Sequence, residues 1–266
     1  MPKLDVDRLE YAILAERADL KRVPMVAAYS NYGTRVEDIP RQFEAAEQRV
    51  RDRGLVHPGG VNDRVMELLG VYAHATVEYD LRFSSKKGTE LRAAVTKATK
   101  TAVRTVVHGD RIILEPVHPN DVIPALVSVL PEHPPARIRP ALSIDLADVR
   151  AAMADANRQG DDDPRAIEQA LRARGANTAN FRKMTQLLDG PRLGLGEAGV
   201  TIWDDLGKEH RGDQTLRIID LEQGRTAVYN SGNQRMFAGA DVSTFTRVLG
   251  ELATQTRRAA TEALRW

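Results

Sequence analysis

The sequence of 266 residues contains no cysteine, few aromatic residues and no long apolar run. The lack of cysteine excludes disulfide bonds, thiol nucleophiles and cysteine-ligated metals. Aromatic residues make up 5% of the chain, which leaves few rings that could stack on nucleic-acid bases. No stretch approaches the roughly 18 apolar residues of a membrane helix, and the first residues lack the apolar core of a signal peptide. We therefore expect a cytoplasmic protein that does not insert into a membrane.

Charge is balanced over the whole chain but not along it. With 38 Lys and Arg against 37 Asp and Glu, the net charge gives no preference for a partner of either sign. Segment 82–111 is an exception, because it holds eight basic residues against Glu90 and Asp110. Such charges often only solvate a sheet face and protect its edges. The functional alternatives are an acidic protein partner or a nucleic acid, and the single aromatic residue of the segment, Phe83, favours the protein.

The first half of the chain is predicted to contain helices followed by strands. Helical spacing of apolar residues indicates helices near 36–53 and 65–72. The period then changes to the strict alternation that is typical of a half-buried strand. Four strands joined by short turns require an antiparallel meander, and a helix opened by Pro119-Asn120-Asp121 follows it. The four strands are predicted at 77–83, 91–97, 101–107 and 111–115.

The second half repeats this plan. Three helices are predicted first, the second of them capped by Asp163, and a last helix opens at Asp241. Placing Asp121-Val122 on Asp241-Val242 superposes the two closing helices at an offset of 120 residues, which suggests duplication of a half. The alternative is that the two helix starts resemble each other by chance. We predict one α+β domain over 1–266, with a central antiparallel sheet from two pseudo-symmetric halves, 1–135 and 141–266, and helical bundles. Strands of the second half are expected at 199–203, 215–220, 226–229 and 235–237.

The chain contains one literal dinucleotide-binding pattern, G-x-G-x-x-G at 194–199. A dinucleotide site needs these glycines to open a helix whose N-terminal amides hold the pyrophosphate. Here the next residues, Val200 to Trp203, are β-branched and aromatic and continue as a strand. No predicted helix separates the glycines from Asp220. The pattern is therefore interpreted as a glycine-rich strand entry and not as a nucleotide site.

Other catalytic patterns are equally unsupported. Ser84 and Lys87 match S-x-x-K, but they lie between two predicted strands and not at a helix start. The six histidines never occur at i, i+2 or i, i+4 spacing, so a histidine-based zinc site is not expected. We predict no catalytic residues, no metal and no cofactor, and hence a binding protein that is not an enzyme.

Three stretches of the sequence are similar to one known family. They are the strand-turn-strand with a Pro-Asp helix entry at 102–130, the strand GLGEAGVTIW at 194–203, and the hairpin IIDLEQGRTAVY at 218–229. Together with the order of elements, they resemble the EspG family, chaperones of the actinobacterial type VII secretion system. The chain departs from the family at 231–233, where members often place Gly-Trp.

The resemblance implies a cytosolic chaperone that binds the hydrophobic helical tip of the PPE subunit in a PE–PPE heterodimer. Such a chaperone keeps the heterodimer soluble and directs it to the secretion machinery. By position, the contacts would fall on the turn at 84–89 and on the second-half helices, so we expect asymmetric binding on a nearly symmetric scaffold. Nucleic-acid binding by 82–111 stays the alternative, and the oligomeric state, the subsystem and the cognate pair stay open. The expected partner-binding residues are Phe83, Ser84, Ser85, Lys86, Lys87, Gly88, Arg92, Phe181, Met184 and Leu188.

Overall fold

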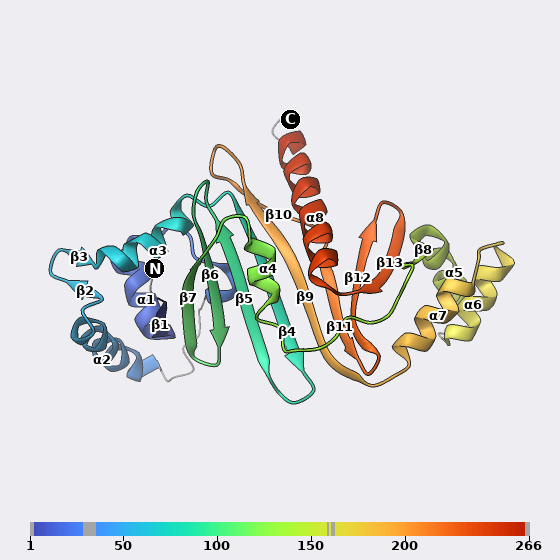
Figure 1. Ribbon diagram of the computed structural model, residues 1–266, viewed down its shortest axis with the longest axis horizontal. Helices are drawn as coiled ribbons and strands as arrows, with labels where there is room; N and C mark the ends of the chain where they lie inside the picture. Colours follow the sequence, from blue (N-terminus) through green and yellow to red (C-terminus); the bar gives the residue numbers. More distant parts are fainter. Residues whose placement is uncertain (1–2, 29–35, 159, 161–162, 264–266) are drawn as a thin grey trace.

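One wide antiparallel sheet forms the centre of the molecule (Figure 1). The computed structural model describes residues 3–28, 36–158, 160 and 163–263. The sheet has 11 strands in the order β1-β7-β6-β5-β4-β9-β11-β12-β13-β8, with β10 paired to β9, and a separate hairpin joins β2 to β3. The strands are β1 Leu4–Asp7, β2 Val56–His57, β3 Gly60–Val61, β4 Val77–Ser85, β5 Glu90–Lys97, β6 Ala102–His108, β7 Arg111–Val117, β8 Leu142–Asp145, β9 Arg192–Trp203, β10 Glu209–Arg211, β11 Leu216–Leu221, β12 Gly224–Ser231 and β13 Gln234–Gly239.

The helices follow the same order in the two parts of the chain. A short strand precedes three helices, a group of strands follows, and one more helix closes each series. The helices are α1 Arg8–Arg17, α2 Ile39–Asp52, α3 Asp63–Ala73, α4 Val122–Val127, α5 Leu146–Arg158, α6 Pro164–Ala173, α7 Ala179–Leu188 and α8 Val242–Ala263, with short 3₁₀ helices η1 Met25–Ala27 and η2 Val36–Asp38 between α1 and α2.

The two opening strands, β1 and β8, were missed by sequence reasoning because each has only four residues. Both alternate between buried and half-buried positions and both end in an aspartate. Asp7 Oδ1 accepts the backbone N–H of Glu10 at 2.8 Å, and Asp145 Oδ1 accepts that of Ala147 at 2.8 Å. Each aspartate thus satisfies an N–H group of the helix that follows it.

The strand order is symmetric about the pair β4–β9. Outward from this pair, the sheet runs β5, β6, β7, β1 on one side and β11, β12, β13, β8 on the other. The opening strand of each series therefore becomes an outer edge of the sheet. This arrangement confirms the predicted α+β class with a central antiparallel sheet built from two similar series of elements.

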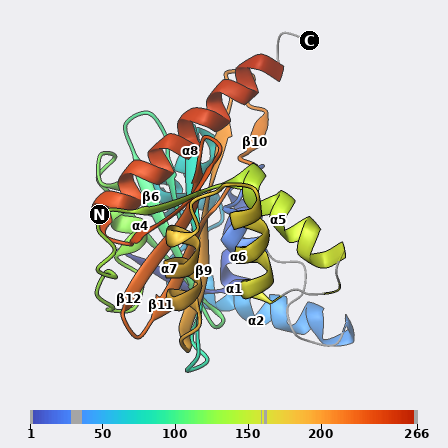
Figure 2. The same ribbon diagram turned by 90° about the vertical axis from the view of Figure 1, so that its right-hand side faces the viewer.

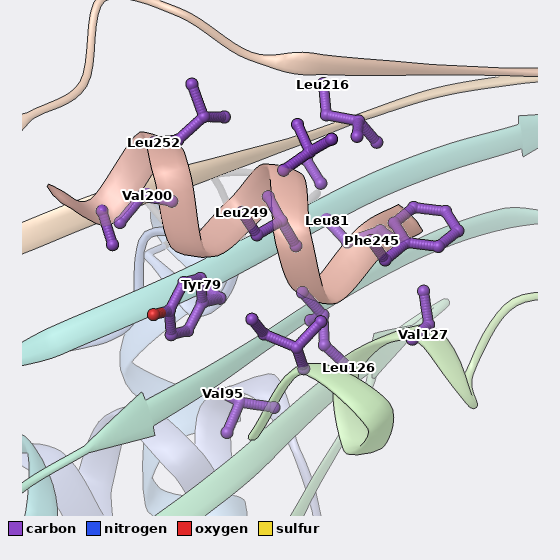
Figure 3. Close-up of a cluster of buried hydrophobic side chains, with 14 of the residues drawn as sticks. Tyr79, Leu81, Val95, Leu126, Val127, Val200, Leu216, Phe245, Leu249 and Leu252 are labelled. Atoms are coloured by element: carbon purple, nitrogen blue, oxygen red, sulfur yellow. The ribbon is translucent and has the colours of Figure 1, made fainter. Parts of the chain in front are cut away.

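Helices α4 and α8 cover one face of the sheet (Figures 1 and 2). Figure 3 shows Phe245, Leu249 and Leu252 of α8 packed over Leu81 and the neighbouring strands. These side chains are at most 4% exposed. Burial of large aliphatic and aromatic side chains stabilises a fold by roughly 1.5–3 kcal/mol each, so this cluster joins the two series of strands.

The opposite face carries two helical lobes at its two ends. Helices α1 to α3 pack on the strands around β6 and β7, and α5 to α7 pack on β8, β12 and β13. In Figure 2, α8 lies on one side of the sheet, whereas α1, α2, α5 and α6 lie on the other. Across the described ranges, no helix is both long and apolar enough to span a bilayer.

A buried arginine ties the connection between the two series to the sheet. Arg225 forms a 2.7 Å ion pair with Asp220, and its guanidinium donates to the carbonyl of Pro131 at 2.9 Å. Its backbone N–H donates to the carbonyl of Pro134 at 2.6 Å. Gly224 lies beneath the same connection at φ +121°, where an added side-chain carbon would be 2.7 Å from the backbone nitrogen of Ala136. Within the hairpin at 218–229, the pattern Asp-x-x-x-Gly-Arg formed by Asp220, Gly224 and Arg225 is therefore a structural clamp on this connection.

Candidate functional site

On the sheet face that carries the two helical lobes, the central strands are uncovered next to the second lobe, which consists of α5 to α7. In the first series, the long connection between α1 and α2 includes η1, which packs on β4, β5 and β6. In the second series, α5 ends at Arg158 and α6 begins at Pro164, so the connection is too short to cover the sheet in the same way. A groove of about 800 Å³ lies there, between the sheet and helices α5 and α7.

The contact of η1 with the sheet depends on a buried carboxylate. Glu78 of β4 is 3% exposed. Its carboxylate accepts the backbone N–H of Met25 at 3.3 Å and the hydroxyl of Thr96 at 2.7 Å. Burial raises the pKa of Glu78 to about 7, because a charged carboxylate loses its hydration there. The first lobe is thus fixed to the sheet where the second lobe leaves a groove.

The walls of the groove are apolar. Helix α5 contributes Val149 and Met153, helix α7 contributes Phe181, and strand β9 contributes Leu195. Met153 is 46% exposed and Leu195 is 45% exposed, although both are large hydrophobic residues. Exposed apolar residues that gather in one place mark binding surfaces more often than residues scattered singly.

The floor of the groove is the centre of a row of residues that faces the lobes along the whole sheet. At both ends of this row the residues are apolar, for example Val107 on β6 and Val228 on β12, and the lobes cover them. The middle of the row, on the uncovered strands, is charged. In order of strand pairing, the row is Val6, Ile112, Val107, Arg92, Arg82, Glu197, Arg217, Val228, Phe237 and Leu142.

Half of the predicted site residues border this groove. Phe181, Met184 and Leu188 project from α7, and Ser84 lies on the exposed face of β4. Phe83 also borders the groove, but it is 3% exposed and belongs to the core beneath α8. Met184 is likewise buried, at 4% exposure, in the core of the second lobe. Neither residue has the exposure expected of a contact, whereas Phe181 and Leu188 are partly exposed and form the α7 wall.

The other predicted residues lie beside the groove on the β4–β5 turn. Lys86 and Lys87 are exposed, and the backbone N–H of Lys86 donates to the carbonyl of Leu193 on β9 at 2.8 Å. Gly88 adopts φ +83°, which glycine tolerates best. Ser85 closes the turn, since its hydroxyl accepts the N–H of Thr89 at 3.2 Å. Arg92 follows on β5, next to Gly88 in a smaller hollow.

The basic segment 82–111 does not form one continuous surface. Arg104 points to the α4 face, where it donates to the carbonyl of Ala125 at 2.9 Å and pairs with Glu115. Arg111 pairs with Asp5 at 2.6 Å. Arg82, in contrast, faces the groove. The charges of the segment are thus divided between two faces and partly neutralised, which gives the nucleic-acid alternative little support.

The glycine pattern at 194–199 belongs to a strand, as predicted, but β9 begins at Arg192 and not at Gly199. Gly194 and Gly196 pair with the end of β4, and their missing side chains leave the space that the Phe83 ring fills. Among the described residues, no group of three or more acidic, histidine or cysteine residues could hold a metal ion. The pair His210–Asp204 holds the β9–β10 turn, since Asp204 also accepts the N–H of Lys208 at 2.8 Å.

Sequence reasoning missed the wall formed by α5 and the arginines near the floor. Leu146, Val149 and Met153 follow helical spacing and predict a helix, but the spacing alone does not show that they face a groove. The spacing of apolar residues is the same for a core stripe and for a binding wall. Arg217 and Arg235 each lie in a short strand whose neighbours are unknown from the sequence. No local signal distinguishes them from solvent-facing arginines.

The fold is that of a solved chaperone structure. The structure of the Mycobacterium tuberculosis type VII secretion system chaperone EspG5 in complex with a PE25–PPE41 dimer matches with a TM-score of 0.70 over 96% of both chains, at 15% sequence identity. At that identity the likeness establishes the fold. Residues 7–251 match the EspG family, and the chain belongs to this family, which confirms the resemblance. No curated protein matches the chain.

Proposed function

We propose that this protein is a cytoplasmic chaperone of type VII secretion that binds a PE–PPE heterodimer. In this proposal, the hydrophobic helical tip of the PPE subunit lies in the groove between the sheet and helices α5 and α7. Binding keeps the heterodimer soluble and directs it to the secretion machinery. The support is membership of the EspG family and the EspG5 structure of the same fold, which holds a PE–PPE dimer.

The observation that carries the proposal is the open groove with its exposed apolar wall. An aliphatic helical tip needs a surface that removes it from water, and α5 with α7 offers one next to an accessible sheet face. Charged residues border the groove on the β4–β5 turn, as is usual for the rim of a protein interface. The partner then binds only next to the second lobe of a nearly symmetric scaffold, because η1 covers the corresponding part of the sheet next to the first lobe.

A binding role without catalysis fits the groups that the groove contains. Its lining is mainly apolar, and its charged residues are arginines with Glu197. A general acid–base pair or an activated nucleophile would need titratable groups in contact with one another. We propose that the protein requires no cofactor and acts only by binding.

Co-expression with PE–PPE pairs tests the proposed function. We expect one pair to give a heterotrimer that survives size-exclusion chromatography. Met153→Glu and Leu195→Glu place a charge in the apolar wall and should weaken this complex at least about tenfold. Leu206, which is 83% exposed and lies outside the groove, supplies the control Leu206→Glu. All three variants should keep the thermal midpoint of the wild type, since their side chains are exposed.

Two results would contradict the proposal. One is the absence of a heterotrimer with every PE–PPE pair tried. The other is a heterotrimer whose affinity is the same for the two groove variants and for Leu206→Glu, because that result would place the partner on another surface.

A further inference from the structure

The groove contains a group of arginines whose charges have no acidic partner. Arg82 and Arg217 lie on its floor, Arg235 lies on β13, and Arg150 reaches it from α5. Within the described part of the chain, the side chains of these four residues form no ion pair or hydrogen bond. Glu197 is the only acidic residue among the described residues of the lining. It lies beside Arg217 in the strand register without forming an ion pair with it.

Arginines on the outer side of the same lobe are paired. Arg174 of the loop after α6 contacts Asp155 at 2.8 Å, and Arg172 contacts Glu168 at 2.9 Å. These two arginines thus differ from the four groove arginines, which have no acidic partner among the described residues. Burial lowers the pKa of Arg235, and the nearby positive charges of Arg217 and Arg150 lower it further.

Covering these arginines with an apolar helix alone would be unfavourable. Burial of a guanidinium that loses water without gaining an acceptor is strongly unfavourable, and an opposite charge with good geometry offsets that cost. A carboxylate suits the planar guanidinium well, since two N–H groups can donate to its two oxygens. The positive charge of the groove also attracts an acidic partner over a distance and excludes basic ones.

We propose that the segment bound in the groove carries carboxylate side chains that pair with Arg217 and Arg235, next to the apolar residues that contact α5 and α7. The inference rests on the proposed function and adds a basis for selecting among partners. Apolar tips without a carboxylate at this place would bind weakly even where their shape fits. The arginines then act as specificity residues, and the apolar wall supplies most of the buried area.

The test uses the heterotrimer with its PE–PPE pair and measures the dissociation constant at low and at high salt. Arg217→Glu and Arg235→Glu should each weaken binding at least about tenfold at low salt. Arg258→Glu makes the same charge change on α8, outside the groove, and should bind like the wild type. Each Asp and Glu of the PPE tip is then changed to Lys, and one of these variants should restore binding to Arg217→Glu while it weakens binding to the wild type.

The outcomes separate the two proposals. If the wild type forms no heterotrimer, the proposed function fails and this inference falls with it. If the heterotrimer forms and both arginine variants bind within about twofold of the wild type, only this inference is overturned. It is also overturned if the arginine variants bind weakly but no carboxylate of the tip matters, because backbone carbonyls would then be the acceptors. The inference is supported if binding recovers when Arg217→Glu is combined with a tip variant in which an Asp or Glu is changed to Lys.

Discussion

Phe83 on β4 lies directly opposite Gly196 on β9, and its ring fills the space that a side chain at Gly196 would occupy. The same ring lies 5.6 Å from the guanidinium carbon of Arg225, which pairs with Asp220. One aromatic residue thus links the glycine-rich strand to the clamp on the connection at 131–141. The glycines and the Asp-x-x-x-Gly-Arg hairpin, which are separate segments of the sequence, meet at this ring.

The first prediction concerns Gly196→Ala. The added carbon would lie 2.6 Å from the backbone oxygen of Arg82 and 2.9 Å from the Phe83 ring, so two central strands must move apart. We expect the free energy of unfolding to fall by about 1–3 kcal/mol, measured by urea denaturation. The control is Gly70→Ala in α3, where nothing lies within 4 Å, and a gain of up to about 1 kcal/mol is expected. Equal effects of both changes would contradict this packing role.

The second prediction concerns Asp220→Ala. Asp220 and Arg225 are each 7% exposed at the side chain, so loss of the carboxylate leaves a buried guanidinium without its counter-charge. We expect a loss of about 3–5 kcal/mol in the free energy of unfolding. Glu251→Ala removes one partner of an exposed pair, Arg247–Glu251, at 48% and 43% exposure. That change should cost less than about 1 kcal/mol, and an equally small loss at Asp220 would show that the clamp is not buried in solution.

The third prediction concerns the pH dependence of stability. The folded protein raises the pKa of Glu78 from 4.5 to about 7, so it keeps a proton that the unfolded chain has released. The contribution of Glu78 to the free energy of unfolding therefore falls as the pH rises from about 4.5 to 7. Glu78→Gln removes this titration, and the thermal midpoint of the variant relative to that of the wild type should rise over this window. The difference corresponds to about 1.4 kcal/mol per pKa unit. A constant difference from pH 4.5 to 8 would contradict the raised pKa.

The sequence allowed the sheet and the order of elements to be predicted, because the alternation along β4 to β7 and the glycine turns are local signals. It did not allow the groove to be predicted. Both α5 and α7 were predicted from apolar spacing, and partner contacts were expected on α7 only because of the family resemblance. Whether the apolar face of either helix is core or binding wall depends on what covers the sheet. The groove exists because only five residues connect α5 to α6, and the described residues of the second lobe include no counterpart of η1. That is a property of the assembled fold, and so is the gathering of Arg217 and Arg235 from separate strands.

The fourth prediction concerns the turn beside the groove. The β4–β5 turn is held by backbone hydrogen bonds, for example from Gly88 N–H to the Ser85 carbonyl at 3.0 Å. The exposed Lys86 and Lys87 side chains can therefore change without loss of the turn. Lys86→Glu with Lys87→Glu should weaken the PE–PPE complex several-fold, mainly through slower association, and the effect should shrink as salt is added.

The matched control for this change is Lys97→Glu with Lys100→Glu, which alters the net charge equally near the other end of β5. It should leave the association rate close to that of the wild type, since charges at the far end of the strand do not border the groove. Both double variants should keep the wild-type thermal midpoint. If the first variant lost stability but bound its partner unchanged, the turn would be structural. If both variants slowed association equally, net charge would be responsible and the turn would have no special place in the interface.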